Sequence, residues 1–167
     1  KTTSGSIDFA DSCKMAFERF EQILKISEKK LSDIDSFLDV GCGPGRYLYA
    51  AEKLIGKIEL TGVDTGQSII EKNRTREELT NIEFILEDVL CKSLKQKYSM
   101  VMCNGVAHHT GVPLEKVIKR HSELISDKGL YFIFVYGYGG FELKSWKFLQ
   151  ETVGKYPKED VFNFWSS

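Results

Sequence analysis

Hydrophobic and polar positions follow two successive patterns along this chain. From about Phe9 to Leu31, apolar residues recur at helical spacing, which predicts one long amphipathic helix. From residue 37 onward, short apolar runs alternate with amphipathic stretches. The runs predict strands at 37–40, 58–63, 82–86, 98–103 and 130–136. The stretches predict helices at 46–55, 67–79, from 113 to about 125, and at 142–153, with a turn at 127–129.

This alternation predicts a doubly wound, Rossmann-like α/β fold with right-handed crossovers and a parallel sheet of strand order 3-2-1-4-5. We expect a single domain over 1–167, with an N-terminal helical cap (1–36), a cofactor-binding core (37–136) and a partial C-terminal region (137–167). The strand at 130–136 is almost entirely apolar and is expected to be covered on both faces. Ligands in such sheets bind at the carboxyl ends of the strands, beside strand one.

A glycine-rich turn follows the first predicted strand. Three glycines, Gly41, Gly43 and Gly45, occupy alternate positions just before the helix at 46–55. Glycines let the backbone approach a ligand closely, and the helix N-terminus adds free N–H groups and partial positive charge. The spacing departs from the dinucleotide pattern G-x-G-x-x-G, which would place a glycine at Arg46. Asp39, two residues before the first glycine, suits a cationic ligand better than a pyrophosphate.

The string Asp-x-Gly-x-Gly-x-Gly at 39–45 resembles motif I of the class I S-adenosylmethionine-dependent methyltransferases. The segment Asn-Gly-Val-Ala-His-His-Thr at 104–110 resembles a string that follows strand four in a subset of small-molecule methyltransferases. The resemblance implies S-adenosylmethionine as cofactor, with Asn104 near the methionine amine and the helix at 9–31 helping to cover the site. The residues implied at the methionine end are Asp39, Gly41, Cys42 and Gly43.

Acidic residues follow the second and third predicted strands. Asp64 lies 19 positions after Gly45. In nucleotide-binding α/β folds, a carboxylate at about this spacing accepts hydrogen bonds from ribose hydroxyls. The alternative is that Asp64 caps the N-terminus of the following helix. The resemblance places Asp88 beside the adenine amine and the backbone N–H of Val89 against a ring nitrogen. The alternative for Glu87-Asp88-Val89 is a solvated acidic turn.

Three histidines differ in what their positions indicate. His108 would lie at the mouth between cofactor and acceptor, where it serves as a general base or a substrate hydrogen-bond donor, or where it simply holds the loop. A structural role is favoured for His109. His121 lies on the apolar stripe of a predicted helix and is interpreted as a hydrogen-bonded core residue.

Composition narrows the classes of partner. The 167 residues carry 23 Lys plus Arg and 24 Asp plus Glu, a net charge of −1, so no nucleic-acid or membrane surface is indicated. No apolar run is long enough to span a bilayer. The four cysteines show neither C-x-x-C pairing nor a histidine at ligand spacing, so we expect reduced thiols, no metal site and a cytoplasmic protein.

Together these features favour methyl transfer from S-adenosylmethionine to a small-molecule acceptor. Two alternatives remain: a cofactor-binding fragment or inactive module of a longer enzyme, and a nicotinamide-dependent oxidoreductase, which the glycine spacing and Arg46 disfavour. The family sheet usually continues through two further strands, for which the chain after residue 136 is short. We therefore expect the strand at 130–136 to lie at or near a sheet edge, paired with a second copy in a homodimer or covered by residues 161–165.

Overall fold

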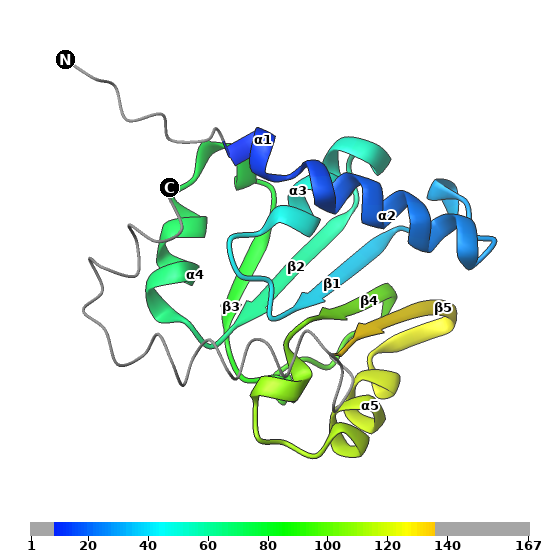
Figure 1. Cartoon of the computed structure of the whole chain (residues 1–167), viewed down its shortest axis with the longest axis vertical. Coiled ribbons are helices and arrows are strands. Elements are labelled where there is room, and N and C mark those ends of the chain that lie inside the picture. The colour runs from blue at the N-terminus through cyan, green and yellow to red at the C-terminus, as the bar shows by residue number, and fades with distance from the viewer. Residues whose placement is uncertain (1–8, 136–167) are drawn as a thin grey trace, which may run out of the picture. The chain divides into compact units, whose positions relative to one another are not determined.

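The computed structural model describes residues 9–135, and its sheet has the predicted order. Five parallel strands are arranged β3-β2-β1-β4-β5 (Figure 1). The strands are β1 (Ser36–Val40), β2 (Glu59–Asp64), β3 (Glu83–Leu86), β4 (Tyr98–Asn104) and β5 (Ile125–Phe134). All five residues of β1 are buried, as expected for the central strand of a sheet with helices on both faces. The doubly wound fold and its order 3-2-1-4-5 are therefore confirmed.

Helices connect these strands and precede the first of them. The α-helices are α1 (Phe9–Ser12), α2 (Lys14–Ile26), α3 (Arg46–Ile55), α4 (Gln67–Arg74) and α5 (Leu114–Glu123). Single 3-10 turns are η1 (Leu31–Asp33), η2 (Glu77–Leu79) and η3 (Ala107–His109). The described residues up to Phe134 belong to one compact unit. The helix expected at 142–153 and the strand-like segment at 161–165 lie outside the described residues.

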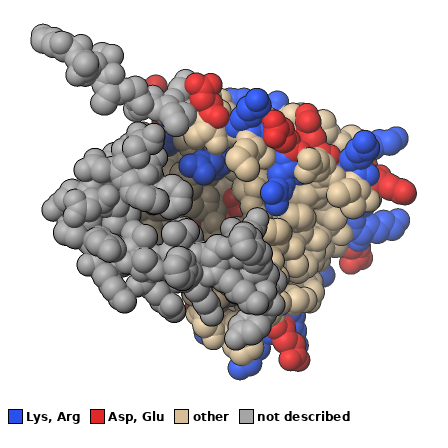
Figure 2. Space-filling model, in the orientation of Figure 1, with Lys and Arg blue, Asp and Glu red and all other residues tan. Residues whose placement is uncertain are grey.

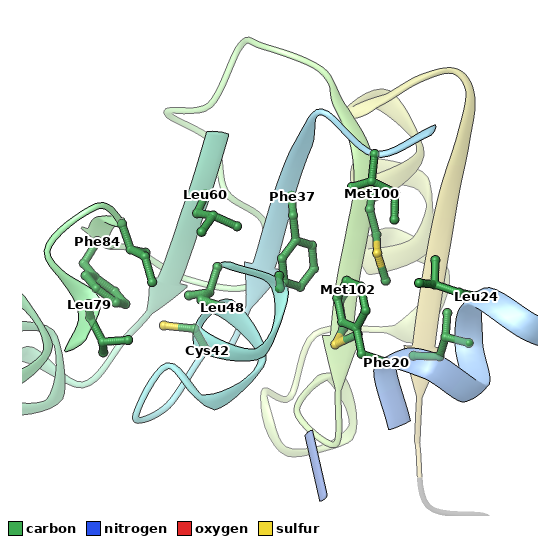
Figure 3. Close-up of a cluster of buried hydrophobic side chains, with 14 of the residues drawn as sticks. Phe20, Leu24, Phe37, Cys42, Leu48, Leu60, Leu79, Phe84, Met100 and Met102 are labelled. Atoms are coloured by element: carbon green, nitrogen blue, oxygen red, sulfur yellow. The ribbon is translucent and has the colours of Figure 1, made fainter. Parts of the chain in front are cut away.

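The main hydrophobic core lies between the sheet and the helices α2, α3 and α4. Figure 3 shows side chains of α2 and α3 packed against those of β1, β2 and β4. The labelled residues are Phe20, Leu24, Phe37, Cys42, Leu48, Leu60, Leu79, Phe84, Met100 and Met102. Helix α5 instead lies beside β4 and β5, away from α2 and α3 (Figure 1). Because side chains alternate along a strand, the residues that share a face with Phe37 on β1 point toward α2 and α3.

Two predicted helices are interrupted. In each case, a side chain near the interruption donates a hydrogen bond to a backbone carbonyl. At the α1–α2 junction, the Ser12 hydroxyl and the Cys13 thiol both donate to the carbonyl of Phe9, at 2.6 and 3.2 Å. After α4, the Thr75 hydroxyl donates to the carbonyl of Lys72 at 3.0 Å. Such local bonds compete with the helical ladder. The helix predicted over 9–31 is therefore divided into α1 and α2, and it ends at Ile26, where the Ser27 hydroxyl donates to the carbonyl of Leu24 at 3.1 Å. The helix predicted over 67–79 continues after Arg74 only as the turn η2.

Strand β5 begins earlier than predicted, and its residues are less buried than predicted. It begins at Ile125, which pairs with Tyr98, and the next paired residue, Leu130, lies opposite Met100. The predicted turn at 127–129 is thus an insertion within the strand, with Lys128 at φ +62°. The described part of β5 is only half-buried or exposed rather than covered on both faces. It is the last strand in the order of the described sheet, so on one side no described strand pairs with it.

The described surface carries no dominant charge on the face shown in Figure 2, where acidic and basic side chains are interspersed. Within residues 9–135, no helix is both long and apolar enough to span a bilayer. The four cysteines are buried with free thiols.

We expect Gly62→Ala to destabilise the fold. A Cβ at Gly62, in the middle of β2, would lie 2.7 Å from Leu48 Cδ1 and 3.0 Å from both Cys42 Sγ and Phe84 Cδ1. Overpacking of this kind costs about 1–3 kcal/mol, which chemical denaturation would measure. Leu48→Ala removes the closest contact, so the double variant should be less destabilised than the sum of the single changes. Strict additivity would contradict this account.

Candidate cofactor site

A small pocket of about 90 Å³ opens at the carboxyl edge of the sheet, between the ends of β1, β2 and β3 and the segment after β4. It is lined by Val40, Gly41, Val63, Asp64, Thr65, Glu87, Asp88, Val89, Val106 and Thr110. Four sequence-predicted residues therefore meet in one place: Gly41, Asp64, Asp88 and Val89. They come from three separate connections, which is what the topological switch point of a doubly wound sheet brings together.

The backbone of Gly41 packs closely against the side chain of Val106 in this site. Gly41 has φ +76°, and its N–H donates to the carbonyl of Val63 at 2.7 Å. A Cβ here would lie 2.4 Å from a methyl group of Val106, another pocket residue. Both the positive φ and the packing therefore require glycine. Val106 was not singled out from the sequence, because its contact with Gly41 joins residues far apart in the chain.

Asp64 connects the glycine turn to the loop after β2. Its carboxylate accepts the N–H of Gly43 and the N–H of Gly66, both at 2.9 Å. The N-cap of α4 is Gly66, and no side chain caps that helix. The helix-capping alternative for Asp64 is therefore wrong, and its carboxylate lies in the pocket wall.

Asp39 carries a buried carboxyl group, and one of its oxygens accepts no hydrogen bond from the described residues. It is 2% exposed, and within the described residues its Oδ2 has no hydrogen-bond partner. Burial, and secondarily the charge of Asp64, raise the pKa of Asp39 to about 7. A buried acceptor without a donor is costly unless something else supplies the donor.

Asn104, at the end of β4, carries a second such oxygen. Its Nδ2 donates to the hydroxyl of Tyr47 at 2.6 Å, whereas its Oδ1 is buried without a partner in the described part of the chain. Asp39 is in register with Met102 on β4, so Asp39 and Asn104 point to the same face of the sheet. Tyr47 is a site residue that sequence reasoning missed, because nothing local links it to Asn104.

The loop after β3 carries the remaining predicted cofactor residues. Asp88 Oδ1 accepts the N–H of Leu90 at 2.8 Å, and the Glu87 carboxylate accepts the N–H and hydroxyl of Ser93. Asp88 is exposed and lines the pocket, whereas Val89 is 5% exposed. The acidic turn is therefore part of the pocket wall, with Asp88 as the more accessible carboxylate.

Two predicted residues of the glycine turn, Cys42 and Gly43, have backbone groups that are already hydrogen-bonded within the protein. Cys42 is buried in the hydrophobic core, and this burial is the main reason that the pKa of its thiol is raised. Gly43 has its N–H on Asp64, and its carbonyl accepts the Asn73 amide at 2.7 Å. Asn73, 1% exposed, is a second supporting residue that the sequence did not reveal.

The histidines occupy three different environments. His108 is half-buried in η3, between the pocket residues Val106 and Thr110, and its ring centroid lies 3.9 Å from that of His109. Burial and, secondarily, His109 lower the pKa of His108, which favours its neutral form. His109 is exposed. His121 is fully buried with both ring nitrogens hydrogen-bonded, so its interpretation as a satisfied core residue is confirmed.

Among the described residues, no cluster of histidine, cysteine and acidic side chains is arranged to hold a metal ion. The polar groups that the structure brings to this region are carboxylate and amide oxygens, backbone groups and the half-buried imidazole of His108. Such a set can bind a ligand that combines a positive charge with hydroxyl and amine donors.

Comparison with known proteins agrees with this geometry. The family model described as a methyltransferase domain matches residues 31–158. Malonyl-[acyl-carrier protein] O-methyltransferase of Bacillus cereus is 26% identical over 122 residues, which cover 72% of this chain and 45% of the relative. The plantazolicin methyltransferase BpumL, solved with a pentazolic desmethylPZN analogue and S-adenosylhomocysteine, superposes with a TM-score of 0.60 at 19% identity, covering 79% of this chain and 49% of that one.

A third relative has a similar fold. Coclaurine N-methyltransferase, solved with N-methylheliamine and S-adenosylhomocysteine, gives a TM-score of 0.59 at 24% identity, covering 80% of this chain and 38% of that one. This chain thus spans less than half the length of each of these three relatives. Since the family model matches well over half of the residues, the chain belongs to the methyltransferase domain family.

Proposed function

We propose that this protein binds S-adenosylmethionine and transfers its methyl group to a small-molecule acceptor. The observation that carries the proposal is the convergence of Asp64, Asp88 and Val89 on one pocket that begins at Gly41. Known relatives named as methyltransferases, two of them solved with S-adenosylhomocysteine, support it. The similarity of residues 104–110 to one subset of small-molecule enzymes is part of this proposal.

The residues present fit the two ends of this cofactor. At the methionine end, Asp39 and Asn104 offer buried oxygens without donors, on one face of adjacent strands. An ammonium group supplies donors and a positive charge, and both suit those oxygens. At the nucleoside end, we assign Asp64 to the ribose hydroxyls, Asp88 to the adenine amine and the Val89 N–H to a ring nitrogen.

The protein's chemical contribution is chiefly alignment. When bound, the sulfonium supplies an already activated methyl group, so no nucleophile or metal is required of the chain. In this proposal, residues of the pocket wall hold the cofactor, and the acceptor approaches beside η3. Such a site would accelerate the transfer by holding the acceptor and the methyl donor together in the correct orientation. We place His108 there, either as the base that takes the acceptor's proton or as a donor that orients the acceptor.

We expect Asp64→Ala to weaken S-adenosylhomocysteine binding by roughly 10- to 100-fold. Hydrogen bonds to a charged group contribute about 1.5–3 kcal/mol, and about 1.4 kcal/mol corresponds to a factor of ten. Titration calorimetry would measure the affinity. Glu71→Ala, which removes an exposed carboxylate from α4, is the matched control and should bind normally. Unchanged affinity in Asp64→Ala would remove the ribose assignment.

The same titrations separate the alternatives. Binding of NADH in place of S-adenosylhomocysteine would favour a nicotinamide-dependent oxidoreductase. Cofactor binding without methyl transfer by the full-length gene product would favour an inactive module. We also propose a cytoplasmic location. For β5, the last strand of the described sheet, we propose pairing with a second copy, which sedimentation or light scattering would test.

A further inference from the structure

The loop between β3 and β4 (residues 87–97) forms one wall of the pocket but contains no helix or strand. Its backbone turns sharply at Cys91, a fully buried non-glycine residue with φ +46°. A positive φ is unfavourable for such a residue and persists only where surrounding contacts enforce it. Part of this support comes from within the loop, where the Cys91 N–H donates to the carbonyl of Asp88 at 3.0 Å, and part comes from outside it.

Helix α5 supplies those contacts through Arg120. The guanidinium donates to three loop carbonyls: Nε to Leu90 at 2.9 Å, and Nη2 to Cys91 at 2.9 Å and to Leu94 at 2.8 Å. Its Nη1 donates to Glu123 on the same helix at 2.9 Å. The Arg120 side chain is 20% exposed, so most of this charge is removed from water and compensated by oxygens. The planar guanidinium of arginine holds several donors in one rigid arrangement, which the compact ammonium group of a lysine does not reproduce.

The next residue of α5 holds the adjacent peptide. His121 Nε2 lies 2.7 Å from the carbonyl of Val89, and Nδ1 lies 2.9 Å from the hydroxyl of Tyr131. Because a carbonyl only accepts, Nε2 carries the proton and donates to Val89, while Nδ1 of the neutral ring accepts from Tyr131. Four carbonyls of one irregular loop thus receive their donors from two consecutive residues of α5.

Leu90, whose carbonyl accepts from Arg120, is also hydrogen-bonded to Asp88, the residue assigned to adenine. Arg120 binds the carbonyl of Leu90, and the N–H of Leu90 donates to Asp88 Oδ1 at 2.8 Å. We propose that Arg120 is a positioning residue that fixes the β3–β4 loop so that Asp88 and Val89 can select adenine. This inference rests on the proposed cofactor. It assigns to α5 a role in nucleobase recognition.

The experiment compares S-adenosylhomocysteine with S-inosylhomocysteine, whose base has an oxygen in place of the exocyclic amine. The wild-type protein should prefer the adenine compound by about tenfold or more, because a carboxylate accepts from an amine but is repelled by a carbonyl. In Arg120→Met, we expect the preference to fall to about threefold or less, with an intermediate value in Arg120→Lys. Lys119→Met removes an exposed cation from the same helix and should retain the full preference.

The ratio of the two affinities distinguishes positioning from general stability. A purely structural role would lower the melting temperature and weaken both ligands equally, so a preference that persists in Arg120→Met overturns the inference. If Arg120→Met does not fold, Arg120→Lys decides in the same way, because retention of the full wild-type preference overturns it. If the wild-type protein binds neither compound, the proposed function itself fails, which is a different result from a preference that Arg120 does not affect.

Discussion

Replacing His108 with glutamine is expected to lower kcat by about 10²–10⁴-fold in the full-length enzyme if the imidazole is the general base. His108 lies in the single turn η3, between Val106 and Thr110 of the pocket. Burial, then His109, lower its pKa below the ordinary value of 6.5, so the neutral ring that can accept a proton predominates at pH 7. The acidic limb of the wild-type rate profile should accordingly lie below pH 6.5.

Steady-state kinetics separate the roles of this residue. A histidine that only orients the acceptor would raise KM and leave kcat nearly unchanged in the variant. Affinity for S-adenosylhomocysteine should change little in either case. His109→Gln, at the exposed neighbouring position, is the matched control and should retain activity. A His108→Gln protein that unfolds, or that keeps both kinetic constants, would favour the loop-holding role.

Asp39→Asn is expected to change binding and stability in opposite directions. The buried carboxylate is the proposed partner of the cofactor's ammonium group, so its loss should weaken S-adenosylhomocysteine binding by roughly tenfold or more. Without ligand, however, the charged form of Asp39 is disfavoured by burial and by Asp64. An amide avoids that cost, so the ligand-free variant should be more stable than the wild-type protein above pH 7.

The pH dependence follows from the direction of the shift. The pKa of Asp39 rises from 3.8 to about 7 on folding, so between these values the folded state binds more protons than the unfolded state. The free energy of unfolding therefore falls as pH rises through this window, by at most about 1.4 kcal/mol per pH unit, and levels off above it. A cationic ligand prefers the carboxylate, so binding should strengthen with pH and release a proton.

Denaturation at pH 5 and pH 8, together with calorimetry in buffers of different ionisation enthalpy, would measure both effects. Asp127→Asn, at an exposed position, is the control and should follow the wild-type profile. The expectation is contradicted if the stability of the wild-type protein rises steadily between pH 5 and pH 8 and Asp39→Asn follows the same curve. That result would show that Asp39 is not held in its neutral form.

Much of the fold was predictable because its determinants are local. Helix α3 begins at Arg46 and ends at Ile55 as predicted, since a glycine turn precedes it and Gly56 follows it. The alternation of strands and helices implies the sheet order, because right-handed crossovers leave few topologies. The carboxyl ends of parallel strands meet at one edge, which is why Asp64 and Asp88 could be assigned to a single site.

The sequence by itself therefore determined the order of elements, the glycine turn and the acids at the strand ends. Only the tertiary structure decided which groups contact them: Val106 over Gly41, Tyr47 on Asn104, and Arg120 on the loop that carries Asp88. It also decided the raised pKa of Asp39, which depends on burial beneath helices and on a carboxylate from another strand. Periodicity and spacing report on neighbours along the chain, whereas packing distances and desolvation depend on residues that only folding brings together.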